Sequence, residues 1–188
     1  MAFPSIASLT SPRLVIRPVH EADLPDLLEV NGDDEVTKFL PYATWRSMED
    51  ATAWLRRMQV PMEAGTAQQL VVQRKSDGKV LGGVLLFKHE APSARLELGY
   101  VLGRGHWRQG LAREALTVVC DHLFRTAGIR RIEAEVNPDN VPSCAVLERL
   151  GFILEGRLRR RWVGKGRAYD TNIYGCLDED WHEREPTR

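Results

Sequence analysis

One stretch of the chain, residues 98–116, has the order of elements that builds an anion site. The apolar run at residues 96–102 predicts a strand that is buried on at least one face. Gly103, Gly105 and Gly110 follow in a loop, and a helical pattern begins directly after them. The first turn of a helix has unpaired backbone N–H groups and the positive end of the helix dipole. We therefore interpret this loop as the binding site for the pyrophosphate of a large cofactor.

Length and composition predict a single globular domain over residues 1–188, with a core at about residues 10–181. The chain is 43% hydrophobic and 28% charged, and its formal net charge is zero. The overall charge therefore provides no argument for binding to nucleic acid or to a membrane. No apolar run approaches the roughly 18 residues of a membrane-spanning helix, and the N-terminus lacks a signal-peptide pattern. We expect a cytoplasmic protein.

The three cysteines, Cys120, Cys144 and Cys176, are far apart in the sequence. They form no CxxC pair, and no cluster of histidine and cysteine has the spacing of metal ligands. We expect no metal site, and we interpret the cysteines as small buried side chains in a reducing compartment.

The hydrophobic patterns predict a mixed α+β domain with about seven strands and about four helices. The early strands follow one another through tight turns such as Asp77-Gly78, which indicates antiparallel pairing. The strand at residues 129–136 follows a helix instead, so a parallel crossover is expected there. The expected strands are residues 13–19, 70–74, 80–87, 94–102, 129–136, 152–163 and 169–177, and the expected helices are residues 21–30, 47–58, 111–127 and 141–150.

The connection at residues 33–45 has no regular pattern and carries several aromatic side chains. Tyr42 and Trp45 lie between two predicted helices. They could form a wall of a substrate site, or they could pack the two helices together.

Three segments in this order resemble the GNAT superfamily of acyl-CoA-dependent N-acyltransferases, and most closely the branch with the ribosomal-protein N-terminal acetyltransferases. They are residues 9–18 (LTSPRLVIRP), residues 97–115, which include WRQGLAREA, and residues 137–152 (NPDNVPSCAVLERLGF). The wider superfamily usually begins the loop with Arg or Gln, whereas this chain has Trp107 at that position, as the branch often does. The loop does not fit the GxGxxG dinucleotide pattern.

The resemblance implies acetyl-CoA as the co-substrate, held in a gap where two strands of a mostly antiparallel sheet splay apart. The pantetheine arm would pair with the strand through Tyr100, Val101 and Leu102. Asn137 and Asn140 would bind its amides, or would serve only as turn residues. The pyrophosphate would meet the backbone N–H groups of Arg108, Gln109, Gly110, Leu111 and Ala112.

Glu97 is the candidate general base, because burial on its strand would raise the pKa of its carboxyl group toward a useful value. It could equally face solvent or pair with an arginine. By resemblance, Ser143 is the candidate acid or hydrogen-bond donor for the departing thiolate. The same serine could cap the helix that follows it. A backbone N–H of Val101 or Leu102 could polarise the thioester carbonyl.

The expected acceptor is a primary amine, most simply the N-terminal α-amine of a protein. An α-amine has a pKa of about 7.7–8.0, so neutralising it at pH 7 costs about 1 kcal/mol, against about 5 kcal/mol for lysine. A small amine such as a polyamine or an aminoglycoside is the alternative acceptor, and a non-catalytic acyl-CoA sensor is an alternative of another class. Asp170 could bind the acceptor ammonium group or pair with an arginine.

A basic run at residues 157–167 is the strongest local charge feature of the chain. The run could be a solvated hairpin, or it could attract an acidic partner or RNA. The sequence leaves the oligomeric state open between monomer and homodimer. The basic residues are Arg157, Arg159, Arg160, Arg161, Lys165 and Arg167.

Overall fold

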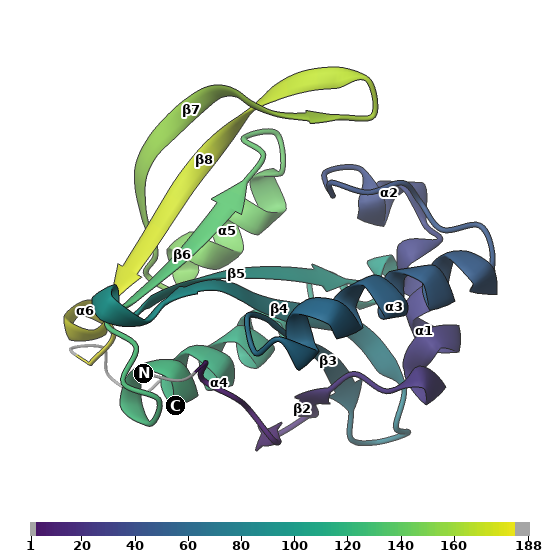
Figure 1. Ribbon diagram of the computed structural model, residues 1–188, viewed down its shortest axis with the longest axis horizontal. Coiled ribbons are helices and arrows are strands. Elements are labelled where there is room, and N and C mark those ends of the chain that lie inside the picture. The colour runs from purple at the N-terminus through teal and green to yellow at the C-terminus, as the bar shows by residue number, and fades with distance from the viewer. Residues whose placement is uncertain (1–2, 183–188) are drawn as a thin grey trace.

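The computed structural model describes residues 3–182 and consists of a single twisted sheet with helices on both faces (Figure 1). The eight strands lie in the order β1-β2-β3-β4-β5-β6-β8-β7. The strands are β1 (Leu9–Thr10), β2 (Leu14–Pro18), β3 (Gln68–Arg74), β4 (Val80–Glu90), β5 (Arg95–Leu102), β6 (Arg131–Val136), β7 (Ile153–Gly164) and β8 (Arg167–Leu177).

The helices divide between the two faces of this sheet. Three further single turns of 3₁₀ helix cover Glu21–Asp23, Ala91–Ser93 and Arg104–His106. The α-helices are α1 (Leu24–Asn31), α2 (Asp34–Thr37), α3 (Met48–Glu63), α4 (Leu111–Arg125), α5 (Val141–Arg149) and α6 (Asp178–His182). Every helix in the described range is too short or too polar to cross a membrane.

The topology confirms the mixed α+β class and the parallel crossover. Each pair of neighbouring strands is antiparallel except β5 and β6, which α4 connects. The described chain has one strand and two α-helices more than expected. These are β1, α2 and α6, which have two, four and five residues. Elements this short are below the length at which hydrophobic periodicity can be recognised.

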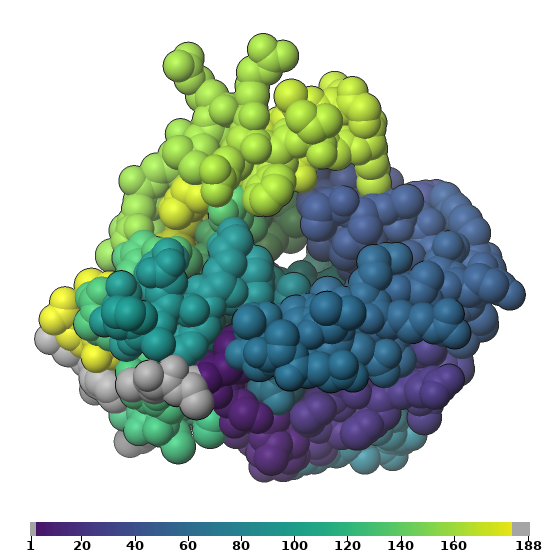
Figure 2. Space-filling view, in the orientation of Figure 1, coloured from purple at the N-terminus to yellow at the C-terminus, as the bar shows by residue number. Residues whose placement is uncertain are grey.

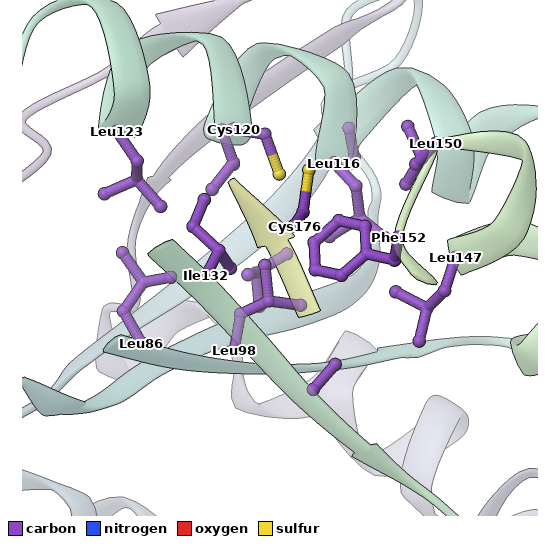
Figure 3. Packing of buried hydrophobic residues seen from close by; sticks show 14 of the residues in the cluster. Leu86, Leu98, Leu116, Cys120, Leu123, Ile132, Leu147, Leu150, Phe152 and Cys176 are labelled. Atoms are coloured by element: carbon purple, nitrogen blue, oxygen red, sulfur yellow. The ribbon is translucent and has the colours of Figure 1, made fainter. Parts of the chain in front are cut away.

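The main core lies between the sheet and the two helices α4 and α5 (Figure 3). The apolar stripe of α4, which includes Leu116 and Leu123, packs on Leu98 of β5 and Ile132 of β6. All three cysteines are buried and none is in a disulfide, which confirms that they act as small core side chains. A second, smaller cluster joins α1 and α3 to the opposite face of β3.

Trp181 attaches the last described helix, α6, to α4. Its ring lies 5.5 Å from that of Phe124, centroid to centroid, and its indole N–H donates to Asp121 Oδ1 at 2.7 Å. Trp181 therefore holds α6 against α4.

The last two strands form a long hairpin that rises away from the rest of the sheet (Figure 1). Its outer strand, β7, is exposed along nearly its whole length. Near the turn, Lys165 Nζ donates to the backbone oxygen of Thr37 in α2 at 2.8 Å. The hairpin is therefore attached at its tip to a helix 128 residues earlier in the chain.

Leu116→Ala should lower the free energy of unfolding by about 2–5 kcal/mol, because the lost side chain leaves a cavity in a packed core. Leu116 is only 1% exposed. Urea denaturation followed by circular dichroism measures the change. Val60→Ala on α3 is the control, since Val60 is 68% exposed and should change stability by less than about 0.5 kcal/mol. Equal effects of the two variants would contradict the packing described here.

Candidate active site

The site is organised by the place where β5 and β6 stop pairing. The two parallel strands are paired over three residues each, and the last pair is Glu97 opposite Glu133. Beyond it, β5 continues along β4 and β6 continues along β8, so the strands diverge. The backbone edge of β5 from Leu98 to Leu102 thus faces a gap on the β6 side. Strand edges of this kind can pair with an extended ligand.

Neighbouring residues of β5 face opposite sides of the sheet, because side chains alternate along a strand. Leu98 and Tyr100 lie on the side covered by α4 and α5. Glu97 lies on the other side, where its cross-strand partner Phe87 also lies, near α3. Glu97 and Tyr100 therefore lie on opposite faces of the sheet at the gap.

The loop before α4 has the conformation of an anion site. Arg108 and Gly110 both have positive φ, of 60° and 75°, and Gly110 is the N-cap of α4. Among the described residues, the backbone N–H groups from Arg108 to Ala112 donate to no protein acceptor. Successive free amides in such a turn form a concave, positively polarised nest. The structure therefore provides the donors that a pyrophosphate requires.

Three side chains that sequence reasoning did not place hold this loop. The indole N–H of Trp107 donates to the backbone oxygen of Leu102 at 2.7 Å, which ties the loop to the end of β5. Arg13 donates to the backbone oxygen of Gln109 and forms an ion pair with Glu114 of α4. The aromatic side chain at the start of the loop thus contributes a hydrogen bond that holds the loop to β5. The one sequence signal for Arg13 was its position in residues 9–18, the N-terminal segment that carries the family resemblance.

Tyr100 and Ser143 meet on the α4–α5 side of the gap. The Tyr100 hydroxyl lies 2.7 Å from Ser143 Oγ and also donates to the Ser143 backbone oxygen at 3.2 Å. Burial raises the pKa of Tyr100 to about 12, so the phenol stays protonated at neutral pH. The pair is therefore a source of hydroxyl hydrogen bonds beside the gap.

The two asparagines both have the local roles that were the alternatives to ligand binding. Asn140 Oδ1 accepts from the Ser143 backbone N–H at 3.3 Å and so caps α5. Asn137 Oδ1 accepts from the Asp139 N–H at 2.9 Å in a tight turn. Capping uses only the oxygen of Asn140, so its amide NH₂ remains available for a ligand.

Glu97 is buried at the vertex of the gap, with 7% of its surface exposed. Burial raises the pKa of its carboxyl group, and the ammonium group of Lys88, 2.7 Å away, opposes that rise. Lys88 is in the bulge at the end of β4 and has a φ of 50°. The alternative that Glu97 pairs with an arginine is therefore wrong, because the partner is a lysine.

Glu135 is a second carboxylate at this vertex, and sequence reasoning missed it. It accepts from the Trp162 indole N–H at 2.7 Å, and Lys88 and Arg161 each approach it to 3.5 Å. The hydrogen bond from Trp162 and the two cations outweigh burial and hold the pKa of Glu135 below its usual value. The alternation of Ile132, Ala134 and Val136 could have indicated that Glu135 lies on the same face as Glu97.

A cavity of about 530 Å³ lies beneath the β7–β8 hairpin, beside the turn that follows β6 (Figure 2). Asp170 lies in its wall and accepts from the Arg160 backbone N–H at 2.9 Å. The lining residues come from the segment after α2, the turn after β6, and the hairpin. They are Lys38, Phe39, Leu40, Asn137, Pro138, Asp139, Arg157, Gly164, Lys165, Arg167, Ala168, Tyr169 and Asp170.

Tyr42 and Trp45 do not line this cavity. Trp45 is 4% exposed and packs on Trp54 of α3 at 5.2 Å between ring centroids. The Tyr42 hydroxyl donates to Asn31 Oδ1 at 2.8 Å. Both aromatic side chains belong to the second core cluster, which supports the helix-packing interpretation over a substrate wall. Instead, their neighbours Phe39 and Leu40 reach the cavity.

No group of three or more histidine, cysteine or acidic side chains within residues 3–182 is arranged to hold a metal ion.

Comparisons with known proteins identify the family of the chain. The family model of the acetyltransferase (GNAT) domain matches residues 13–153. The uncharacterized N-acetyltransferase p20 of Bacillus licheniformis is 30% identical over 174 residues, which cover 93% of this chain and 98% of that protein. The ribosomal protein uS5-alanine N-acetyltransferase of Escherichia coli is 28% identical over 183 residues, with 92% of each chain covered.

Solved structures show the same fold. A GCN5-related N-acetyltransferase from Brucella melitensis has a TM-score of 0.85 and 25% identity, over 96% of this chain and 82% of that one. The spermidine N-acetyltransferase of Vibrio cholerae, solved with CoA and spermine, has a TM-score of 0.79 and 18% identity, over 92% and 100% of the two chains. The chain belongs to the GNAT family of acetyl-CoA-dependent N-acetyltransferases.

Lys88→Met should raise the pKa of the Glu97 carboxyl group, because burial and the neighbouring Glu133 and Glu135 then act without an opposing cation. The ¹³C chemical shift of the Glu97 carboxyl carbon, followed against pH, measures the change. Arg95→Met is the matched control, since Arg95 pairs with Glu133 and Glu90 and not with Glu97. A larger shift in the Arg95 variant than in the Lys88 variant would contradict the pairing.

Proposed function

We propose that this enzyme acetylates the N-terminal α-amine of a protein or peptide by direct attack of the amine in a ternary complex. The observation that carries the proposal is the placement of Glu97 and the Tyr100–Ser143 pair on opposite faces of one strand, at the gap between β5 and β6. One face can then receive the acceptor amine while the other receives the thioester.

The residues at the gap fit acetyl-CoA, which supplies an activated acetyl group whose C–S bond is replaced by an amide C–N bond. The free amides from Arg108 to Ala112 would hold its pyrophosphate, and the Arg108 side chain would add charge. The unpaired β5 edge at Tyr100, Val101 and Leu102 would hold the pantetheine arm, with Asn140 donating to an amide of that arm. Asn137 sits at the end of the same gap.

Glu97 would take the proton that the amine must lose, and Ser143, supported by Tyr100, would supply a proton or hydrogen bond to the departing sulfur. An α-amine is nearly half neutral close to pH 8, so a carboxylate with a moderately raised pKa is a sufficient base for it. A lysine acceptor would demand a stronger one. The chemistry at Glu97 therefore favours an α-amine.

The relatives named for ribosomal-protein acetylation support a protein acceptor, and the wide cavity with Asp170 in its wall is suited to a peptide end. Asp170 would bind the acceptor ammonium before its deprotonation. A small-amine acceptor is the second candidate, since a spermidine acetyltransferase shares the fold. We place the enzyme in the cytoplasm, where its three buried cysteine thiols would remain reduced. We treat the chain as one catalytic domain.

Glu97→Gln and Ser143→Ala should each lower kcat by about 10²–10⁴-fold, the usual contribution of a general acid or base. Steady-state thiol release from acetyl-CoA measures kcat, and calorimetric titration should show acetyl-CoA binding within a few-fold of the parent enzyme. Glu97 acts as the carboxylate, so activity should be lost as the pH falls through its raised pKa. Unchanged turnover in both variants would show that these roles are wrong.

Peptides that begin with Ala or Ser should be acetylated, while spermidine and an aminoglycoside at equal concentration should release little thiol. Mass spectrometry of the peptide locates the acetyl group on the α-amine, and a peptide blocked by a formyl group is the control. Activity confined to the small amines would favour the second candidate. Binding of acetyl-CoA without thiol release for any amine would indicate a sensor.

A further inference from the structure

The wall of the acceptor cavity carries an excess of positive charge. Lys38 lies after α2, Arg157 lies on β7, and Lys165 and Arg167 flank the hairpin turn. The acidic residues that line the same cavity are Asp139 and Asp170. The lining groups therefore number four cations against two anions.

Three of these cations have no carboxylate within ion-pair distance in the described chain. They are Arg157, Lys165 and Arg167, whereas Arg161 on the same hairpin pairs with Glu135. Lys38 approaches only the exposed Glu35, at 3.9 Å. The positive charge of the wall is therefore only partly neutralised by Asp139 and Asp170, and a concave wall with a net charge concentrates the field inside it.

Neither Asp170 nor Asp34 forms an ion pair with these cations in the described chain. Asp170 accepts from the Arg160 backbone N–H at 2.9 Å. Asp34 interacts electrostatically with Lys165, but its carboxylate accepts hydrogen bonds from Arg46 and Thr44 at 2.7 and 2.6 Å. Asp34 does not line the cavity. An acidic ligand would therefore meet the wall without displacing an internal ion pair.

Two of the cations are also held in place. Arg157 Nε donates to Asn172 Oδ1 at 3.0 Å, which orients its guanidinium group and leaves the other N–H groups for a ligand. Lys165 is held at the rim by its bond to the Thr37 backbone oxygen, which leaves two of its three N–H groups without that partner. Such positions lose little side-chain entropy when an anion binds.

We propose that the acceptor is an acidic peptide end, with carboxylate side chains in the residues that follow its reactive α-amine. The proposal rests on the function proposed above and names its substrate class. The carboxylates would lie against Arg157, Lys165 and Arg167 while the amine reaches Glu97. A polyamine, which carries several positive charges, would be repelled by the same wall. RNA competes as an anionic ligand, but a cavity of about 530 Å³ is in the range of pockets for small ligands or a short peptide segment.

The test compares three peptides of equal length that begin with Ser and differ only at positions 2 to 4, which hold Glu, Gln or Lys. Thiol release with acetyl-CoA measures kcat/KM, and fluorescence anisotropy with CoA present measures Kd for the same peptides. We expect the Glu peptide to exceed the Gln peptide by at least about tenfold in kcat/KM, and the Lys peptide to fall below both. The preference should shrink as salt is added.

Arg167→Gln should lower kcat/KM for the Glu peptide at least about fivefold and leave the Gln peptide within twofold. Arg167→Glu should shift the preference toward the Lys peptide. Arg159→Gln is the matched control, because Arg159 lies on the same exposed hairpin but does not line the cavity. It should leave all three peptides within twofold.

Equal values for the three peptides, or an equal loss in the Arg159 and Arg167 variants, would overturn the proposal while leaving α-amine acetylation intact. So would displacement of the Glu peptide by a single-stranded RNA oligonucleotide at lower concentration than by unlabelled Glu peptide. Failure of the proposed function looks different, since no peptide would then release thiol. The anisotropy series and a comparison of free glutamate with spermidine as acceptors would still decide the charge preference.

Discussion

The rest of the site depends on the early end of pairing between β5 and β6. A parallel strand pair normally satisfies the backbone groups of both strands, but here the last pair is Glu97 opposite Glu133. The edge of β5 beyond this point must find other partners, and an extended cofactor arm is such a partner. The same divergence begins at Glu97, the last paired residue of β5. The unpaired edge of β5 and the position of Glu97 thus both result from the early end of the β5–β6 pairing.

The charges at the vertex balance one another rather than leaving Glu97 alone. A buried carboxylate without a partner would hold its proton strongly, and a fully paired one would lose it too easily to act as a base. Lys88 is shared between Glu97 and Glu135, and Trp162 donates to Glu135 from the hairpin. Strand β7 is therefore linked to Glu97 through Glu135 and Lys88.

The cavity beneath the hairpin is built by two strands at one edge of the sheet, β7 and β8, and by a segment from the first part of the chain. The β7–β8 hairpin rises from the sheet edge, and Lys165 bonds its tip to α2. The pairing of β7 with β8 contains two irregularities, and the second lies between Leu158 and Trp162. Bulges of this kind bend a hairpin away from the plane of its sheet. The bend and the tie together make a cavity instead of an open edge.

The sequence alone determined the mixed α+β class, the parallel crossover, the strand–loop–helix order around residues 98–116 and the family resemblance. These depend on periodicity and motif spacing within short stretches, where neighbouring residues decide the outcome. Glu97, Tyr100 and Ser143 could be named for the same reason, although their roles are proposals. Only the tertiary structure decided which distant groups meet. The Lys88–Glu97 pair arises at a bulge, whose backbone changes the direction of a side chain without any periodic signal.

Tyr42 and Trp45 are residues whose surroundings the sequence could not predict. An aromatic residue in an irregular connection can face a ligand or a core equally well, and its pattern does not distinguish the two. Packing against α3 decides for the core, and Phe39 and Leu40 face the cavity instead. The tie from Lys165 to Thr37 joins positions 128 residues apart, and no local pattern contains such a contact. The Lys165–Thr37 contact arises because the fold brings the β7–β8 hairpin next to α2, in the N-terminal half of the chain.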